Sequence, residues 1–113
     1  MKRSNIVQEF NYLVLIHTSA DYQNCENEEL KVPVEYIRWD YPVITDDTRK
    51  GRLHVHELDK AVTKLYDLFC EIRKHLKQDY DNGICSSIHA FEDYCIEQIE
   101  IHPNNLATIY IGS

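Results

Sequence analysis

The chain has 113 residues and carries 12 lysines and arginines against 19 aspartates and glutamates, a formal net charge of −7. Its length allows one domain, and hydrophobic residues at 43% with charged residues at 27% exclude disordered, collagen-like and coiled-coil compositions. An acidic chain is also a poor nucleic-acid binder, because phosphate contacts need a basic face.

The first predicted element is a strand over residues 5–17. Its β-branched and aromatic residues alternate with polar ones, so that one face is apolar. The alternating positions are Ile6, Phe10, Tyr12, Val14 and Ile16. Residues 18–30 follow as the longest predicted loop, and a loop of that length in a small domain is often functional.

A second strand is predicted over residues 32–41. Pro33 and Pro42 predict that it is an edge strand or has frayed ends, since proline cannot donate to a β-ladder. A shorter hairpin is predicted to follow, with residues 43–45 returning as 53–55 around a turn that contains a glycine.

One long helix is predicted over residues 57–80, because apolar residues recur there at steps of three and four. They are Leu58, Ala61, Val62, Leu65, Leu68, Phe69, Ile72 and Leu76. Acidic residues open this segment, basic residues lie towards its end, and Asp81, Asn82 and Gly83 supply a stop signal.

Two more strands are predicted over 94–102 and 106–111, joined by a tight turn at residues 103–105. Strands linked by hairpins form an antiparallel sheet with one face free for the helix. The sequence therefore predicts a single α+β domain over residues 1–113, with an antiparallel sheet of about four to six strands and the long helix packed on one face, in the order ββ(ββ)αββ.

The expected compartment is the cytoplasm. Polar residues interrupt the segment after Met1 that a secretion signal would need to keep apolar, and the apolar run 12–16 is too short to cross a bilayer. The cysteines have neither C-x-x-C nor zinc-finger spacing, so reduced thiols are expected, with Cys70 as a core residue of the helix. The four are Cys25, Cys70, Cys85 and Cys95.

Charge is segregated along the chain. No lysine or arginine occurs in residues 4–30 or in residues 78–113, whereas these two base-free tracts hold many acids. If the first strand and the final hairpin are neighbours in the sheet, the tracts merge into one negative surface that attracts a cationic partner. Tyrosine and tryptophan are typical interface anchors, although they also serve as ordinary core residues. The predicted partner-binding residues are Asp21, Tyr22, Glu26, Glu28, Glu29, Trp39 and Asp40.

Two other sites are weaker possibilities. His54 and His56 would share a face of a strand, next to Glu57, as two imidazoles must to grip one metal ion, but no third ligand is fixed by spacing. Cys95 with His89 or His102 lacks any local signature of a cysteine hydrolase. The isolated glycines form no phosphate-binding loop. The sequence therefore predicts no enzyme, metal or cofactor.

Residues 89–113, from His89-Ala-Phe-Glu-Asp-Tyr-Cys to Ala-Thr-Ile-Tyr-Ile-Gly-Ser113, resemble the ends of small immunity proteins of bacterial toxin systems, including contact-dependent growth inhibition. That resemblance implies a cytoplasmic protein that binds and blocks a toxin domain, often a basic nuclease. A small acidic secretion chaperone, a phage-encoded decoy, and a metal-binding protein or enzyme built on His54 and His56 remain alternatives.

Overall fold

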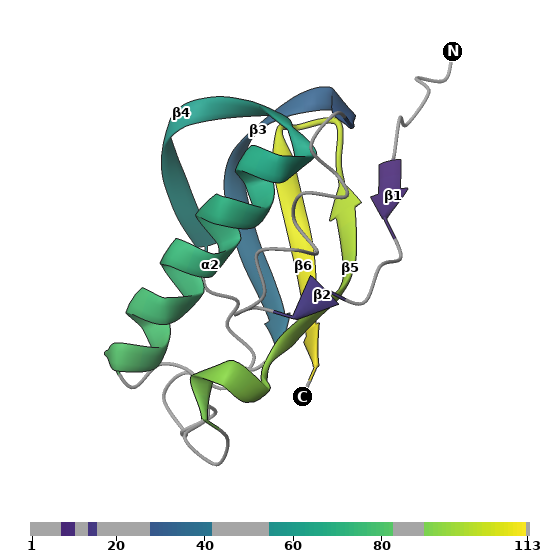
Figure 1. Ribbon diagram of the computed structural model, residues 1–113. Coiled ribbons are helices and arrows are strands. Elements are labelled where there is room, and N and C mark those ends of the chain that lie inside the picture. The colour runs from purple at the N-terminus through teal and green to yellow at the C-terminus, as the bar shows by residue number, and fades with distance from the viewer. Residues whose placement is uncertain (1–7, 11–13, 16–27, 42–54, 83–89, 113) are drawn as a thin grey trace.

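The computed structural model describes residues 8–10, 14–15, 28–41, 55–82 and 90–112. These residues form an α+β fold in which a mixed sheet is covered by an α-helix (Figure 1). The elements are β1 (Gln8–Phe10), β2 (Val14–Leu15), β3 (Glu29–Tyr41), β4 (Val55–Lys64), α2 (Leu65–Asp81), the 3-10 helix η1 (Phe91–Asp93), β5 (Cys95–Ile101) and β6 (Leu106–Gly112).

The strands are ordered β1-β5-β6-β3-β4, and β2 also pairs with β5. Every pairing is antiparallel except that of β3 with β6, which is parallel. The prediction of a purely antiparallel sheet is therefore wrong. Hairpins fix the relative direction of strands that follow one another, as β5 and β6 do, but they do not fix the direction of β3 and β6, which are distant in sequence.

β3 lies inside the sheet, between β6 and β4, so of the two predicted alternatives, an edge strand or frayed ends, the edge strand is wrong. Pro42 lies outside the described residues. Pro33 precedes Tyr36, where pairing with β6 begins. It also falls where the register with β4 shifts between Glu29 and Val34. An irregularity of this kind leaves a residue outside the ladder, so a missing N–H is tolerated there.

The predicted helix over residues 57–80 is confirmed from Leu65 onwards, while residues 57–64 belong to β4. Leu58 and Val62 are the buried residues of β4, and Ala61 is exposed. A spacing of four positions places two side chains on one side of a helix, but because four is even it does the same on a strand. The apolar pattern of this segment was therefore compatible with either structure.

No loop separates β4 from α2, since the helix begins at the residue after Lys64. The N–H of Leu65 donates to the backbone oxygen of Glu28 at 3.0 Å. This bond satisfies one of the donors that a helix start leaves free. Asp67 in the first turn complements the positive end of the helix dipole, and Asn82 closes the far end at the predicted position.

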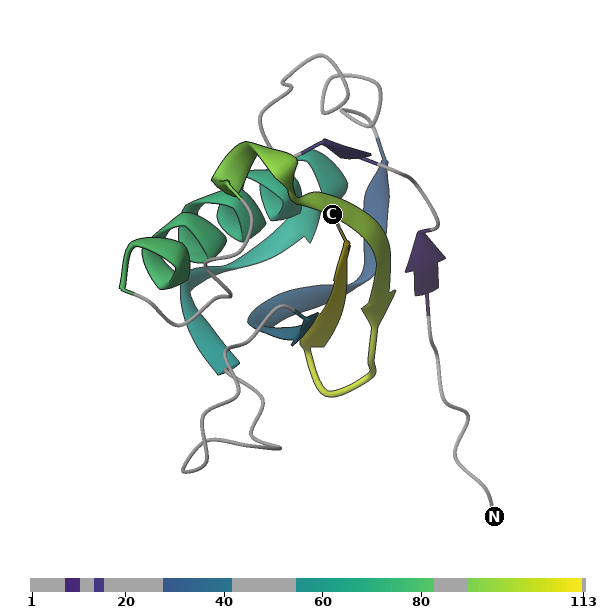
Figure 2. The same cartoon turned by 90° about the horizontal axis from the view of Figure 1, so that it is seen from below.

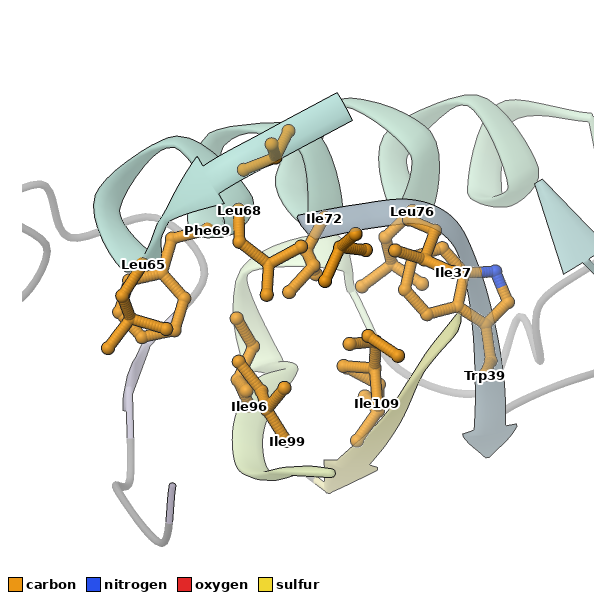
Figure 3. Packing of buried hydrophobic residues seen from close by; sticks show 14 of the residues in the cluster. Ile37, Trp39, Leu65, Leu68, Phe69, Ile72, Leu76, Ile96, Ile99 and Ile109 are labelled. Atoms are coloured by element: carbon orange, nitrogen blue, oxygen red, sulfur yellow. The ribbon is translucent and has the colours of Figure 1, made fainter. Parts of the chain in front are cut away.

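The core lies between α2 and the sheet, and the helix contacts β4 and β3 (Figure 2). Alternate residues of the strands point towards the helix, while every third or fourth helical residue points back. Figure 3 shows Leu65, Leu68, Phe69, Ile72 and Leu76 of α2 packed with Ile37, Trp39, Ile96, Ile99 and Ile109 of the sheet.

The hairpin of β5 and β6 confirms the two strands predicted at the end of the chain. Its turn uses Asn105 with φ of 68°, a left-handed conformation that asparagine tolerates better than most residues. The predicted first strand is described only at residues 8–10 and 14–15, and the predicted hairpin only at Val55. The predicted loop 18–30 lies outside the described residues up to residue 27.

Candidate functional site

Pairing of β1 with β5 brings the two base-free tracts of the sequence together. Gln8, Glu9 and Phe10 lie opposite Ile101, Glu100 and Ile99 in an antiparallel register. β2 extends the same contact, because Val14 and Leu15 lie opposite Ile96 and Cys95. Both sides of this junction come from segments without lysine or arginine. The half of the sheet made by β1, β2, β5 and β6 is therefore free of permanent positive charge.

Two register shifts accompany exposed acidic side chains on this part of the sheet. Between Ile96 and Gln98 the pairing of β5 with β6 skips a residue, so Glu97 has no partner in the ladder and its side chain is exposed. The pairing of β3 with β6 shifts in the same way at Asp40, which is also exposed. A bulge of this kind redirects a side chain without breaking the strand.

Tyr110 of β6 lies between these two strands. Its register partners are Gln98 on one side and Tyr41 on the other. The hydroxyl of Tyr110 donates to Oε1 of Glu100 at 3.0 Å. Glu100 and Tyr110 each lie between residues that point into the core, so both side chains are on the sheet face opposite α2. We define the acidic patch as Asp40, Glu97, Glu100 and Tyr110.

The surroundings of Tyr110 in the acidic patch raise the pKa of its hydroxyl above the ordinary value. The hydrogen bond to Glu100 is the main cause that raises the pKa of Tyr110, followed by partial burial and then by the negative charges of Glu100 and Asp40. A phenol with a raised pKa stays protonated at neutral pH and continues to donate. The acidic patch therefore presents carboxylates around a neutral, half-buried aromatic ring.

A polar row borders the acidic patch on the same face. Nε of Arg38 donates to Oγ1 of Thr108 at 2.9 Å, and Nε2 of His102 lies 2.9 Å from the same oxygen. Nε2 of His102 is also 3.8 Å from Glu100. Arg38 has only donors, so the buried hydroxyl accepts from it and can give its own proton to His102. Arg38 is thus a positive charge beside the acidic patch, and its Nε is engaged in a hydrogen bond.

The structure divides the predicted partner-binding residues. Glu28 and Glu29 are exposed, but they lie at the opposite end of β3 from Asp40, and Glu29 faces Lys64 in the register. Asp40 belongs to the acidic patch. Three further predicted residues lie outside the described part of the chain: Asp21, Tyr22 and Glu26.

Trp39 cannot be an interface anchor in this structure, because its side chain is fully buried. Its indole N–H donates to Oδ2 of Asp79 at 2.6 Å, and Nε2 of His56 lies 2.7 Å from the same oxygen. Asp79, on α2, is itself only 2% exposed. A buried carboxylate needs such donors to offset the loss of water. This arrangement ties α2 to β3 and β4.

His75 lies on α2 one turn before Asp79 and also contacts His56. Its ring is 4.7 Å from the ring of His56, and its Nε2 is 3.4 Å from Oε1 of Glu71. Nδ1 of His75 is buried and finds no hydrogen-bond partner among the described residues. Burial, followed by the nearby His56, lowers the pKa of His75. The imidazole is thus held in its neutral form.

The described residues do not support a metal site at His54 and His56 or a nucleophilic role for Cys95. In the part of the chain that the structure describes, no group of three potential ligands could hold a metal ion. His56 is bonded to Asp79, while His54 and His89 lie outside the described residues. Cys95 is buried, and burial raises the pKa of its thiol, which disfavours the reactive thiolate.

Cys70 corrects another expectation, because it lies on α2 as predicted but is exposed and not a core residue. Neither Cys70 nor Cys95 forms a disulfide. None of the described helices is long and apolar enough to cross a membrane. Comparison of the chain with family models, curated proteins and solved structures finds no match.

Glu97, Glu100 and Tyr110 were not predicted as site residues, although their signal was present in the sequence. Glu97 and Glu100 lie in a base-free tract, and its pairing with the first strand was the condition stated for one merged negative surface. What could not be read from the pattern is the bulge at Glu97, which turns a residue of inward parity outwards. Tyr110 is one of eight tyrosines, and only the register distinguishes it from the others.

Proposed function

We propose that this chain is an inhibitor protein of the immunity type, which binds a basic toxin domain through the acidic patch and blocks its active site. The observation that carries the proposal is the acidic patch, in which Tyr110 donates to Glu100 and lies near the negative charge of Asp40. The pairing of β1 with β5 places a second base-free segment beside it. The resemblance of residues 89–113 to the ends of immunity proteins is the reason for proposing a toxin as the partner.

Charge complementarity supports binding of the acidic patch to a basic active site. An enzyme that acts on phosphodiesters concentrates lysine and arginine at its active site, so a surface with the opposite charge steers the encounter. Steering of this kind raises association rates by about 10- to 1,000-fold at low ionic strength. Gathering like charges costs self-repulsion in the free protein, and a cationic partner relieves that repulsion.

In this proposal Tyr110, and not Trp39, is the aromatic side chain that anchors the partner. Its ring is partly accessible, and its hydroxyl is already oriented by Glu100. A ring held in place before binding loses little rotamer entropy when a partner covers it. Central aromatic side chains of this kind carry much of the binding energy in protein interfaces.

The direct test asks whether the reading frame immediately upstream encodes a protein with a C-terminal toxin domain, and mixes the purified chain with that domain. We expect a one-to-one complex by size-exclusion chromatography with light scattering, and loss of the toxin's activity at the same stoichiometry. Tyr110→Ala should weaken the complex by about 10- to 30-fold, the effect of removing an aromatic anchor. Glu57→Gln is the control, because Glu57 is exposed on β4 outside the acidic patch. A chain that neither binds nor inhibits that domain contradicts the proposal.

A further inference from the structure

Arg38 of β3 carries a positive charge beside the acidic patch, yet it pairs with none of the carboxylates around it. In the register, Thr108 of β6 lies between Arg38 on one side and Glu100 of β5 on the other. All three side chains are on the sheet face opposite α2, since their neighbours along each strand point into the core. Among the described residues, no ion pair involves Arg38.

Two hydroxyl groups hold these opposite charges apart. Nε of Arg38 donates to Oγ1 of Thr108 at 2.9 Å. On the other side of β6, the hydroxyl of Tyr110 donates to Oε1 of Glu100 at 3.0 Å. Glu100 is also 3.8 Å from Nε2 of His102, an imidazole that is positive only when protonated. The face therefore carries an oriented guanidinium and an oriented carboxylate that do not pair with each other.

The guanidinium of Arg38 keeps donors for a ligand. Arginine has five N–H groups, and the bond to Thr108 uses the one on Nε. In the described part of the chain, no hydrogen bond involves its two Nη nitrogens, which form a planar fork that fits a carboxylate. Thr108 is only 4% exposed and belongs to the folded sheet, so it orients the fork before any partner binds.

Accessible aromatic rings lie on both sides of Arg38. Tyr36, two residues earlier on the same face of β3, is 37% exposed. The half-buried ring of Tyr110 lies two residues beyond Thr108 on β6. A partner that covers these rings would exclude water from the guanidinium between them, and an ion pair is stronger where water is excluded.

We propose that Arg38 determines the specificity of this surface, because its guanidinium receives a carboxylate of the partner protein while Glu100 receives a neighbouring basic side chain. The inference rests on the proposed function, in which a basic toxin domain covers this face. A nucleic acid or another polyanion fits less well, because Glu100 and Asp40 repel its further negative charges. The partner selected in this way carries an acidic residue within its basic surface, which distinguishes it from basic proteins in general.

The sign of the effect of Arg38→Gln on toxin binding tests the proposal. Loss of a positive charge makes the chain more acidic, so long-range attraction alone would strengthen its complex with a basic domain. We expect instead that Arg38→Gln weakens the complex by about tenfold, through faster dissociation. Arg38→Lys keeps the charge but lacks the planar fork, and it should weaken the complex less. Arg73→Gln removes an exposed arginine from α2 and is the matched control, which should bind at least as tightly as the wild type.

A pair of capped peptides tests the site without the toxin. The peptides Lys-Lys-Glu-Lys-Lys and Lys-Lys-Gln-Lys-Lys differ in one carboxylate, and each is titrated into isotope-labelled protein. We expect the glutamate peptide, and not the glutamine peptide, to shift the NMR signal of the Nε–H group of Arg38. The preference for the glutamate peptide over the glutamine peptide should be about two- to fivefold greater in the wild type than in Arg38→Gln.

The outcomes separate this inference from the proposed function. Toxin binding that Arg38→Gln leaves unchanged or strengthens would overturn the role of Arg38 and leave the acidic patch as the binding surface. A glutamate peptide that does not shift the Arg38 signal would overturn it as well. Failure to bind any toxin domain contradicts the proposed function, and the peptides then decide the role of Arg38. Circular dichroism checks the fold of each variant, and Arg38→Lys replaces Arg38→Gln in both assays if the latter is unfolded.

Discussion

At the scale of single residues, the buried carboxylate of Asp79 explains why Trp39 is a core residue and not an exposed binding residue. Trp39 was a candidate for partner binding because exposed tryptophans anchor interfaces. Its indole donates to Asp79 instead, so the ring contributes to the core. Asp79 follows Leu76 by three residues and so continues the spacing of the buried face of α2, but a carboxylate at such a position is not predicted to be buried without a known partner. Partners of this kind become visible only when the tertiary structure is known.

Asp79→Ala should lower the free energy of unfolding by about 3 kcal/mol, because it leaves the buried donors of Trp39 and His56 without their acceptor. Urea denaturation followed by tryptophan fluorescence measures the loss. Asp81→Ala is the matched control, since Asp81 is exposed and pairs only with Lys77 at 3.3 Å among the described residues. That change should cost about 0.5 kcal/mol or less. Equal losses in the two variants would show that the Asp79 contacts are not structural.

His75 predicts how stability depends on pH. Its pKa in the folded protein is lowered, chiefly by burial, so the folded state binds fewer protons than the unfolded state. Stability from this group is present above the unfolded pKa of about 6.5 and is lost as the pH falls towards the lower folded value. The charged or titratable groups facing it are His56 on β4 and Glu71, Lys74 and Asp79 on α2.

Denaturation midpoints measured between pH 8 and pH 5 should therefore fall on acidification below about pH 6.5. His75→Phe keeps a ring in the site but removes the titrating group, so its curve should be flatter over that range. His102→Phe is a control on the opposite face of the sheet. A His75→Phe protein with the same acid sensitivity as the wild type would assign the effect to another group.

At the scale of elements, the spacing of apolar residues identified the secondary structure only where that spacing fits a helix and not a strand. Leu65, Leu68, Phe69, Ile72 and Leu76 combine steps of three and four, which no strand reproduces, and they form the buried face of α2. Leu58 and Val62 are an even number of residues apart, so their spacing fits a strand equally well. The hairpin at residues 103–105 was predictable because asparagine tolerates the left-handed backbone found at Asn105.

Ala61→Thr distinguishes a strand from a helix in this segment by the sign of its effect. Ala61 is exposed on β4, where threonine should be neutral or stabilise by up to about 1 kcal/mol. In a helix the same change would destabilise by about 0.6 kcal/mol. Gln78→Thr on the exposed side of α2 is the matched control and should destabilise by about 0.5 kcal/mol. Chemical denaturation measures both, and a loss of stability in Ala61→Thr would contradict the strand.

At the scale of the whole molecule, the α+β class and the terminal hairpin followed from the sequence. The meeting of the two base-free tracts was only a condition there, and the pairing of β1 with β5 meets it. The parallel pairing of β3 with β6 did not, because it joins strands that no hairpin connects. The predicted binding set was likewise divided, since Asp40 lies in the acidic patch while Glu28 and Glu29 lie at the far end of β3. Charge distribution along a chain predicts the sign of a surface, but the register decides which residues form it.

The most direct test of the central claim is the association rate with the proposed partner, a basic toxin domain sought in the reading frame immediately upstream, measured by stopped flow at rising ionic strength. For the wild type, we expect the rate to fall by about tenfold or more between 50 and 500 mM salt, as screening removes the steering. The variant Glu97→Gln with Glu100→Gln should associate more slowly at low salt and respond less to salt, while Glu57→Gln should follow the wild type more closely. A wild-type rate that does not change with salt, or a Glu97 and Glu100 variant that matches it throughout, would contradict docking through the acidic patch.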